Sequence, residues 1–416
     1  MNNKLQVISI KSQVRKYITC TLVLATCYFS HAVEIKPVIN TQLLGGQYFY
    51  NGQDNSFGGD ASLVASPYIH LNDQWTVVPL YSGSYQGTKQ VADLAGGGTL
   101  FQDSQDHRFS TKVIRSLPHD LKVKVVGSYG LEWLRETKDE TWTKGLYDNH
   151  RTSGGTELEW DWTKQRIARL TYDYYTIHFP NYQSLESTQQ GSGLGRELSQ
   201  PNVLDNQNHM VGLSYETDLP AQGVLEGHLS YTRRTYGDQN IVLLSGSLDS
   251  ETRHDNIHSI SLEGTWPILM RSEERLFTTL GYAWSDLQSN QNHYDPGKQN
   301  PFNENYYSNI QHTLQNRWTL LLGDSQNPWT ITGNGSLSRQ QYANRHTQNA
   351  LGDYESDVTH VDTAMLGLTF TYPIAQGFRL VVTTDVGWSN ANTHYDAIYQ
   401  YHYHTADYLL GFSYAY

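Results

Sequence analysis

The sequence predicts an all-β protein, a transmembrane up-and-down antiparallel β-barrel of about sixteen strands, within a range of roughly 14 to 18. Three observations carry this prediction. Apolar and polar residues alternate with a period of two through many segments, short and long connections alternate between those segments, and tryptophans collect at segment ends. A membrane strand shows this weak alternation because one face meets lipid and the other meets a wet interior.

The alternation is clearest in residues 407–416. One face is aromatic and apolar: Tyr408, Leu410, Phe412, Tyr414 and Tyr416. The other face is mostly small or polar: Asp407, Leu409, Gly411, Ser413 and Ala415. Residues 378–388, 363–372 and 121–133 repeat the pattern. A soluble β-sandwich would alternate in the same way, so alternation alone leaves both architectures open.

The connections discriminate better between the two. Short turns are predicted near residues 72–73, 117–119, 164, 219–222, 270–272, 324–326 and 374–376. Long polar loops are predicted near residues 51–59, 86–106, 137–153, 181–207, 237–255, 287–304, 342–357 and 393–402. Outer-membrane barrels have tight periplasmic turns and longer extracellular loops. Residues 33–416 are therefore predicted to form one barrel domain, closed by pairing residues 41–50 with the last strand.

Tryptophans mark the predicted strand ends, as expected where amphipathic rings sit at the level of lipid headgroups. They are Trp75, Trp133, Trp162, Trp266, Trp284, Trp318, Trp329 and Trp388. The alternative is that they fill the core of a sandwich. A soluble sandwich with this many strands would be unusually large, which favours the barrel.

The N-terminus predicts a signal peptide over residues 1–32. Four basic residues precede an apolar stretch at about 17–29, and residues 30–32 offer a small-x-small cleavage site. Both cysteines, Cys20 and Cys27, lie inside this segment, so the mature chain is expected to form no disulfide and no thiolate metal site. The competing interpretation is a lipoprotein acylated at Cys27; the bulky Thr26 disfavours it.

The charge balance argues against a nucleic-acid partner. The chain has 29 basic and 41 acidic residues. Removing the four basic residues of the signal segment leaves 25 and 41, a formal charge of −16. Nucleic-acid binding proteins usually carry a basic surface instead.

Together with the C-terminal Tyr414-Ala415-Tyr416, these features resemble Gram-negative outer-membrane β-barrel proteins of porin-like architecture over about residues 33–416. The resemblance implies the cell outer membrane, contact with its lipid and lipopolysaccharide, and recognition of Tyr414 and Tyr416 by the barrel-assembly machinery. Tyr416 departs from the Phe that the family most often carries there. A homo-oligomer is compatible with the resemblance. The subfamily is not identified, and fold alone does not give function.

Charged residues on the polar face of four neighbouring strands are the candidate site. They form a predicted pore-lining ladder of Lys112, Lys122, Lys124, Glu157, Glu159, Asp161, Arg169 and Asp173. Counting from the short turns places Lys122 and Lys124 at about the height of Asp161 and Glu159. Such a ladder would set a transverse field across a pore, or would neutralise itself and stiffen the wall; both interpretations stay open.

The predicted function is diffusion or weakly selective uptake of small polar solutes, cationic or neutral, saccharides included. An export or surface-assembly barrel for polysaccharide or protein is the first alternative. A surface adhesin or receptor using residues 181–207 is the second. No enzyme, cofactor or metal site is predicted. His394, His402 and His404 are interpreted as a polar loop, and the acidic run 353–357 with Asp362 as a solvated one.

Overall fold

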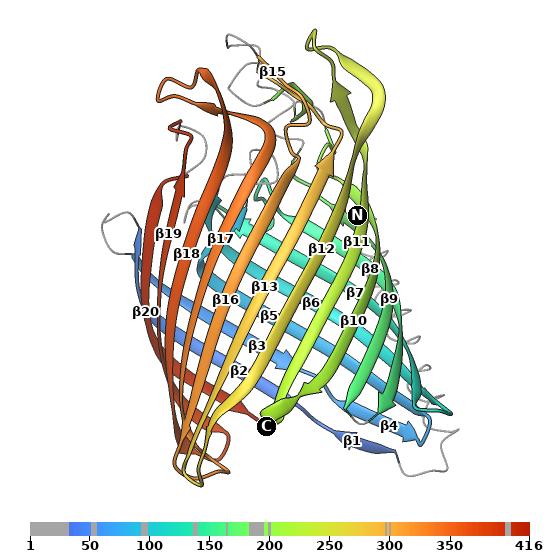
Figure 1. Cartoon of the computed structure of the whole chain (residues 1–416), viewed down its shortest axis with the longest axis vertical. Helices are drawn as coiled ribbons and strands as arrows, with labels where there is room; N and C mark the ends of the chain where they lie inside the picture. Colours follow the sequence, from blue (N-terminus) through green and yellow to red (C-terminus); the bar gives the residue numbers. More distant parts are fainter. Residues whose placement is uncertain are drawn as a thin grey trace, which may run out of the picture.

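The structure, a computed structural model, confirms a closed antiparallel β-barrel (Figure 1). It describes residues 33–50, 56–92, 99–135, 140–163, 165–182, 195–198, 201–295, 298, 301–395 and 401–416. The predicted signal peptide, both cysteines and the predicted turn at residue 164 lie outside these residues. The one large sheet joins 18 strands. β1 and β2 share one position, because β1 pairs with β4 and β2 pairs with β3, and β3 and β4 share the next position beside β5; this leaves sixteen positions around the wall of the described barrel.

The strands follow one another around the wall in chain order. The first half comprises β1 (Glu34–Lys36), β2 (Ile39–Tyr50), β3 (Ser56–Ala65), β4 (Tyr68–Asn72), β5 (Trp75–Ala92), β6 (Thr99–Leu117), β7 (Leu121–Arg135), β8 (Asn149–Thr163), β9 (Arg166–His178) and β10 (Asn206–Leu219). The second half comprises β11 (Gly223–Val242), β12 (Leu248–Met270), β13 (Glu274–Ser289), β16 (Asn309–Leu322), β17 (Trp329–Gln348), β18 (Tyr354–Ala375), β19 (Phe378–Ala391) and β20 (Tyr403–Ala415). Between β13 and β16, β14 (His293–Tyr294) and β15 (Phe302–Asn303) form a separate small hairpin, and two short 3-10 helices are η1 (Arg196–Leu198) and η2 (Pro220–Gln222).

The barrel closes through β2 and β20, which pair antiparallel from Asn40 opposite Ala415 to Tyr50 opposite Thr405. This seam confirms the predicted pairing of residues 41–50 with the last strand. Two glycines allow the strands to approach. A Cβ atom on Gly46 would overlap the carbonyl oxygen of Tyr408, and one on Gly411 would overlap that of Leu43. Closure leaves no free sheet edge, which a membrane strand requires because lipid cannot satisfy backbone hydrogen bonds.

The outer wall is apolar. Leu43, Leu158, Leu229, Leu337 and Leu410 are each between 43% and 62% exposed although they are large and hydrophobic. Their immediate neighbours in sequence point inward, because successive side chains of a strand alternate between the two faces. An apolar exterior around a closed antiparallel wall is the arrangement of outer-membrane barrels, and it confirms the predicted location. Among the described residues, no helix is long and apolar enough to span a membrane.

Aromatic side chains flank the apolar band. Trp75 and Trp329 begin β5 and β17, and Trp162 lies next to the end of β8. All three are exposed on the outer wall at the end where the connections are short. Trp388 lies near the other end of β19 and is also exposed. These positions agree with the predicted interfacial tryptophans.

The short connections gather at one end of the barrel together with the C-terminus, and the long ones with β15 lie at the other (Figure 1). We call these the short-turn end and the mouth. Several segments predicted to be loops instead continue the strands: β11 and β12 extend to Val242 and Leu248, and β17 and β18 to Gln348 and Tyr354. The prediction was wrong there because these extensions are mostly polar on both faces, so they lack the alternation that marks a lipid-facing strand.

The outer wall gives a stability prediction. Replacing Leu229, which is 52% exposed in the middle of β11, with arginine is expected to lower the free energy of unfolding by about 2–4 kcal/mol, because a charge would face the hydrocarbon. The matched control is Ser230→Arg, whose side chain points inward. Urea-induced unfolding in lipid vesicles measures both, and an equal loss for the two variants would contradict the assignment of the faces.

Candidate functional site: the inner wall and the mouth

Seven charged residues on the inner wall form a continuous chain of ion pairs across β7, β8, β9 and β10. Lys122 Nζ donates to Glu159 Oε1 and to Asp161 Oδ2, both at 2.8 Å. Lys124 Nζ donates to Glu157 Oε1 and to Glu159 Oε2, both at 2.6 Å. The chain continues through Arg169 to Glu216, a carboxylate that the sequence analysis did not single out.

Glu159 is the centre of this chain. It is only 5% exposed and receives hydrogen bonds from Lys122, Lys124 and the Nε atom of Arg169, the last at 2.8 Å. A carboxylate can accept several such bonds, and bonds between ionised partners are stronger than neutral ones. Glu159 therefore ties three strands together at the level of their side chains.

The predicted heights were close but two residues from the observed register, although both predicted pairs, Lys122 with Asp161 and Lys124 with Glu159, are bonded. Lys122 lies directly opposite Glu159, and Lys124 opposite Glu157, whereas Asp161 and Glu159 had been expected. Barrel strands are staggered because the wall must shear to close, so counting residues from the turns misplaces partners. The lysine side chains are long, and each of the two nevertheless bonds to two carboxylates of β8.

Two residues of the predicted ladder stand outside the ion-pair chain. Lys112 lies on β6 opposite Val126 of β7, and it has no ion-pair partner within the part of the chain that the structure describes. The Asp173 carboxylate occupies the space above Gly155, where a Cβ atom would collide with it. The structure thus joins six of the eight predicted residues, and the role of all eight in a pore stays a prediction.

A second inner-wall feature was missed by the sequence analysis. Asp60, Asp385 and Asp407 lie on β3, β19 and β20, beside the closing seam. Asp385 and Asp407 are opposite each other in the register, and the backbone N–H of Asp385 donates to Asp407 Oδ1 at 3.2 Å. No lysine or arginine pairs with any of the three among the described side chains. The sequence signal was present, since all three occupy inward positions, but only closure of the barrel brings β3 to β20.

The mouth is partly covered by packed loops. Buried apolar residues of the β7–β8 and β9–β10 connections form one cluster with Leu134 at the end of β7; the others are Tyr147, Phe179, Tyr182, Leu198, Val203 and Leu204. Asp148 supports this cap by accepting hydrogen bonds from the backbone N–H groups of Leu134 and Gly145. Burial raises the pKa of the Asp148 carboxyl to about 6. The loops are therefore held by a small hydrophobic core of their own, which an open rim would not need.

Helix η1 joins two distant parts of the rim. Leu198 belongs to the cluster beside β7 and β8. The residue before it, Glu197, contacts the other side: its carboxylate accepts hydrogen bonds from His293 Nδ1 and the Tyr307 hydroxyl, both at 2.8 Å. His293 and Tyr307 come from the connection between β13 and β16. Burial raises the pKa of Tyr307 well above its ordinary value, and Glu197 raises it further, so the phenol remains a donor.

Two buried arginines line the same region. The Arg253 guanidinium lies 4.5 Å from the ring centre of Tyr236 and 4.1 Å from that of Tyr307, and it donates to both oxygens of Asp255. Although burial raises the pKa of Asp255, Arg253 holds it below the ordinary value. Arg345 is surrounded by tyrosine rings in the same way, and its Cζ atom lies 4.6 Å from the ring centre of Tyr306. Stacking on aromatic rings, together with the ion pair in the case of Arg253, makes a buried guanidinium tolerable.

The three histidines near the last loop do not converge. The rings of His394 and His402 are 5.7 Å apart, but His404 is exposed on the outer wall. Within the described residues, no group of three or more His, Cys, Asp or Glu side chains is arranged to hold a metal ion. Asp362 does not join the acidic run 353–357. Its side chain faces outward, and its Oδ1 atom lies 3.8 Å from Arg339 Nε.

At the C-terminus, Tyr414 and Tyr416 follow the outward parity of β20, and Tyr416 is 68% exposed. The backbone of Tyr416 exchanges two hydrogen bonds with Ile39. These contacts extend the seam to the last residue. Recognition of the two tyrosines by assembly machinery stays a prediction.

Comparison with known proteins finds solved structures of similar fold but no match by sequence. No protein-family model and no curated protein matches the chain. OccAB1 of Acinetobacter baumannii is similar in structure, with a TM-score of 0.47 and 10% identity over 93% of this chain and 97% of that one. OpdK of Pseudomonas aeruginosa has a TM-score of 0.45 and 9% identity, over 92% of this chain and 99% of OpdK. A bacterial polysaccharide outer membrane secretin has a TM-score of 0.42 and 10% identity, over 91% of this chain and 97% of the secretin. At these values no property of those proteins is transferred to this chain.

Proposed function

We propose that this protein is an outer-membrane channel for diffusion or weakly selective uptake of small polar solutes, with a preference for cationic and neutral ones. The observation that carries the proposal is the inner wall: a closed sixteen-strand barrel whose inward side chains are polar and charged. A barrel of this size is wide enough to leave a water-filled passage, and polar side chains keep such a passage wetted.

The inner wall carries two kinds of charge. In the ion-pair chain three cations face four carboxylates, so it is close to neutral and stiffens the wall while it orients water. The carboxylates of Asp60, Asp385 and Asp407 are not balanced in this way, and they add a local negative potential near the seam. Such a potential raises the local concentration of cations and lowers that of anions.

The structure of the mouth favours a channel for small solutes over one for polymers. Helix η1 links the β7–β8 side of the rim to the β13–β16 side through Leu198 and Glu197, and we infer that this link narrows the entrance. A polysaccharide or an unfolded protein would need η1 to move, whereas a small solute would pass beside it.

The orientation belongs to the same proposal. The short-turn end would face the periplasm and the mouth the outside, after removal of residues 1–32. Planar-bilayer recording of the refolded protein tests the channel directly, and we expect discrete open-channel currents. Absence of any current, with the barrel shown to be folded, would contradict the proposal.

The acidic residues provide the selectivity test. Replacing Asp385 and Asp407 together with asparagine is expected to lower the ratio of cation to anion permeability at least two-fold, because two unbalanced charges are removed at nearly constant volume. The reversal potential in a salt gradient measures it. The control is Asp324→Asn in an exposed short turn, where asparagine can still accept the hydrogen bond from Gln326 N. Equal reversal potentials for all three proteins would show that the two carboxylates do not face the conducting path.

A further inference from the structure

The inner wall contains a hollow of about 210 Å³ on β11, β12, β13 and β16. Two neighbouring rows of inward side chains line it, and the members of each row lie opposite one another from strand to strand. One row is Ser230, Ser259, Ser285 and Gln311; the other is His228, Ser261, Ala283 and Thr313. The wall is hollow here because serine and alanine side chains are short.

Four hydroxyl groups in the hollow are free to bond a solute. Within the part of the chain that the structure describes, the side chains of Ser230, Ser259, Ser261 and Ser285 make no hydrogen bond to another protein group. All four residues are partly exposed. A hydroxyl can donate one hydrogen bond and accept two, so the hollow offers both donors and acceptors.

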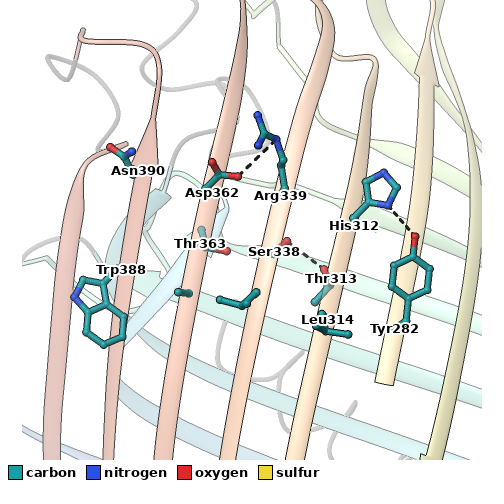
Figure 2. Close-up of a pocket in the computed structure, with 12 residues that line it drawn as sticks. Tyr282, His312, Thr313, Leu314, Ser338, Arg339, Asp362, Thr363, Trp388 and Asn390 are labelled. Carbon is teal, nitrogen blue, oxygen red and sulfur yellow. Dashed lines mark hydrogen bonds and ion pairs between the residues drawn. The ribbon is translucent and has the colours of Figure 1, made fainter. Parts of the chain in front are cut away.

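The border of the hollow on β16 is held by Ser338 of β17. The Oγ atom of Ser338 accepts hydrogen bonds from Gln311 Nε2 at 2.9 Å and from Thr313 Oγ1 at 3.1 Å. Figure 2 shows the second of these bonds. The Gln311 amide is therefore fixed in position, and its carbonyl oxygen is left to accept a hydrogen bond from a solute. Groups that are already held in place lower the cost of binding.

The hollow offers no unbalanced charge. Among the described residues that line it there is no lysine, arginine, aspartate or glutamate. Glu226 and Glu263 lie two residues further toward the short-turn end of β11 and β12, and each has a partner. Glu226 Oε1 lies 3.0 Å from His228 Nε2, and Glu263 Oε1 lies 3.7 Å from Arg317 Nη2. An ionised solute would therefore lose water in the hollow without gaining a counter-charge.

The same two rows of the wall carry the ion-pair chain on the neighbouring strands. Arg169 of that chain lies opposite Ser214, and Ser214 lies opposite His228 of the hollow. The inner wall is thus divided around its circumference into a charged sector on β7–β10 and an uncharged hydroxyl sector on β11–β16. A neutral solute exchanges water for protein hydroxyls at little cost in the second sector, whereas in the first it would displace water from ionised groups.

The outer wall contains a larger groove, of about 490 Å³, over β13, β16, β17, β18 and β19 (Figure 2). Its floor includes Tyr282, Leu337 and Trp388, and beside the floor Arg339 lies 3.8 Å from Asp362. These two charged groups satisfy each other, and an apolar floor on the outer wall suits any lipid. The outer groove therefore selects no particular ligand, in contrast to the free hydroxyls of the inner hollow.

We propose that the inner hollow is a binding site for an uncharged polyhydroxylated solute of about the size of one sugar ring. Its volume equals that of about seven water molecules at roughly 30 Å³ each, which is enough for one ring. Hydroxyls of the solute exchange hydrogen bonds with Ser230, Ser259 and Ser285 along one row. The proposal rests on the proposed channel, because a solute reaches the inner wall only through a water-filled passage. It adds a place where neutral solutes are retained, separate from the carboxylates that favour cations.

Saturation-transfer NMR on the refolded full-length barrel in a sugar-free detergent tests the site. The probe is glucose, and the ring-matched charged probes are glucosamine and glucuronate at pH 7. We expect saturable binding of glucose with a dissociation constant on the order of millimolar, and roughly five-fold weaker binding of both charged probes. Replacing Ser259 and Ser285 together with alanine is expected to weaken glucose binding about ten-fold, since two hydrogen-bonding groups are lost.

The matched control replaces Ser128 and Ser153 together with alanine. These serines also face inward and lie opposite each other on neighbouring strands, but they bond to each other at 2.5 Å and lie outside the hollow. The control is expected to bind glucose like the unchanged protein. Folding of both double variants is checked by their heat-dependent mobility in gels.

Three outcomes would overturn the site. The first is no saturable glucose binding to a barrel that conducts ions. The second is equal affinity for the three probes, which would remove the preference for an uncharged solute. The third is equal loss of binding in the two double variants, which would show that glucose contacts the wall at large. The NMR measurement requires no current, so failure of the site and failure of the channel proposal are separate results.

Discussion

Replacing Gly411 with alanine is expected to prevent closure of the barrel. The added methyl group would overlap the carbonyl oxygen of Leu43 on the partner strand, and β2 and β20 would have to separate along their paired length. An open edge leaves backbone groups without hydrogen-bond partners in lipid, each costing several kcal/mol, so the folded yield should fall at least ten-fold. The loss of the heat-modifiable band in gels after refolding into vesicles measures it.

The control for this variant is Gly127→Ala. Gly127 lies within β7, and a Cβ atom there would meet no atom within 4 Å. Both changes introduce the same residue with the same strand propensity, so they differ only in the space available. Normal folding of the Gly411 variant would show that the seam adjusts by shifting the register and that the close approach is not required.

Replacing Glu197 with alanine is expected to open the mouth. The change removes the hydrogen bonds from His293 and Tyr307 that hold η1 against the far rim. Hydrogen bonds to charged groups contribute about 1.5–3 kcal/mol each, so the population with η1 released should rise at least ten-fold. We expect a higher mean single-channel conductance and faster cleavage near residue 197 by an external protease.

Glu251→Ala is the matched control, because Glu251 is a glutamate at the same end of the barrel whose side chain is 61% exposed and 4.0 Å from His254. It should leave conductance and cleavage unchanged. If Glu197→Ala accelerates cleavage without changing conductance, η1 is released but does not restrict the passage. If neither quantity changes, the two hydrogen bonds do not hold the loop.

The parity of the strands could be predicted from sequence. Tyr408, Leu410 and Phe412 were assigned to the lipid-facing side, and each is more than half exposed on the outer wall. The seam was predictable for the same reason, since an even number of strands with short turns at one end leaves the first and last strands as neighbours. These features depend on a period of two and on turn length, which are local in the chain.

Partners across strands were predicted less well. Lys122 and Lys124 were expected beside acidic residues, and the structure pairs them with Glu159 and its neighbours, in a register two residues from the predicted one. The stagger between strands is a property of the whole barrel, because it must sum to a fixed shear around the wall. Glu216 completes the ion-pair chain and was not singled out for the same reason.

The contacts at the mouth and the position of the outer groove could not be predicted from the sequence. Glu197, His293 and Tyr307 come from two loops roughly 100 residues apart, and their contact has no periodic signal. Arg339 and Asp362 were visible as charges, yet their outward position opposite Tyr282 and Trp388 required the register of neighbouring strands. Both sites are made by loops or rows that only the closed wall brings together.

The sequence by itself determined the architecture: alternating strands, alternating connections and the lipid-facing side of the strands. Each of these follows from interactions within a short stretch of chain or with the surrounding solvent. Only the tertiary structure decided which charges pair, where carboxylates remain unbalanced, which parts of the rim η1 connects and where the outer wall is hollow. These depend on shear and closure, which are set by all sixteen strand positions at once.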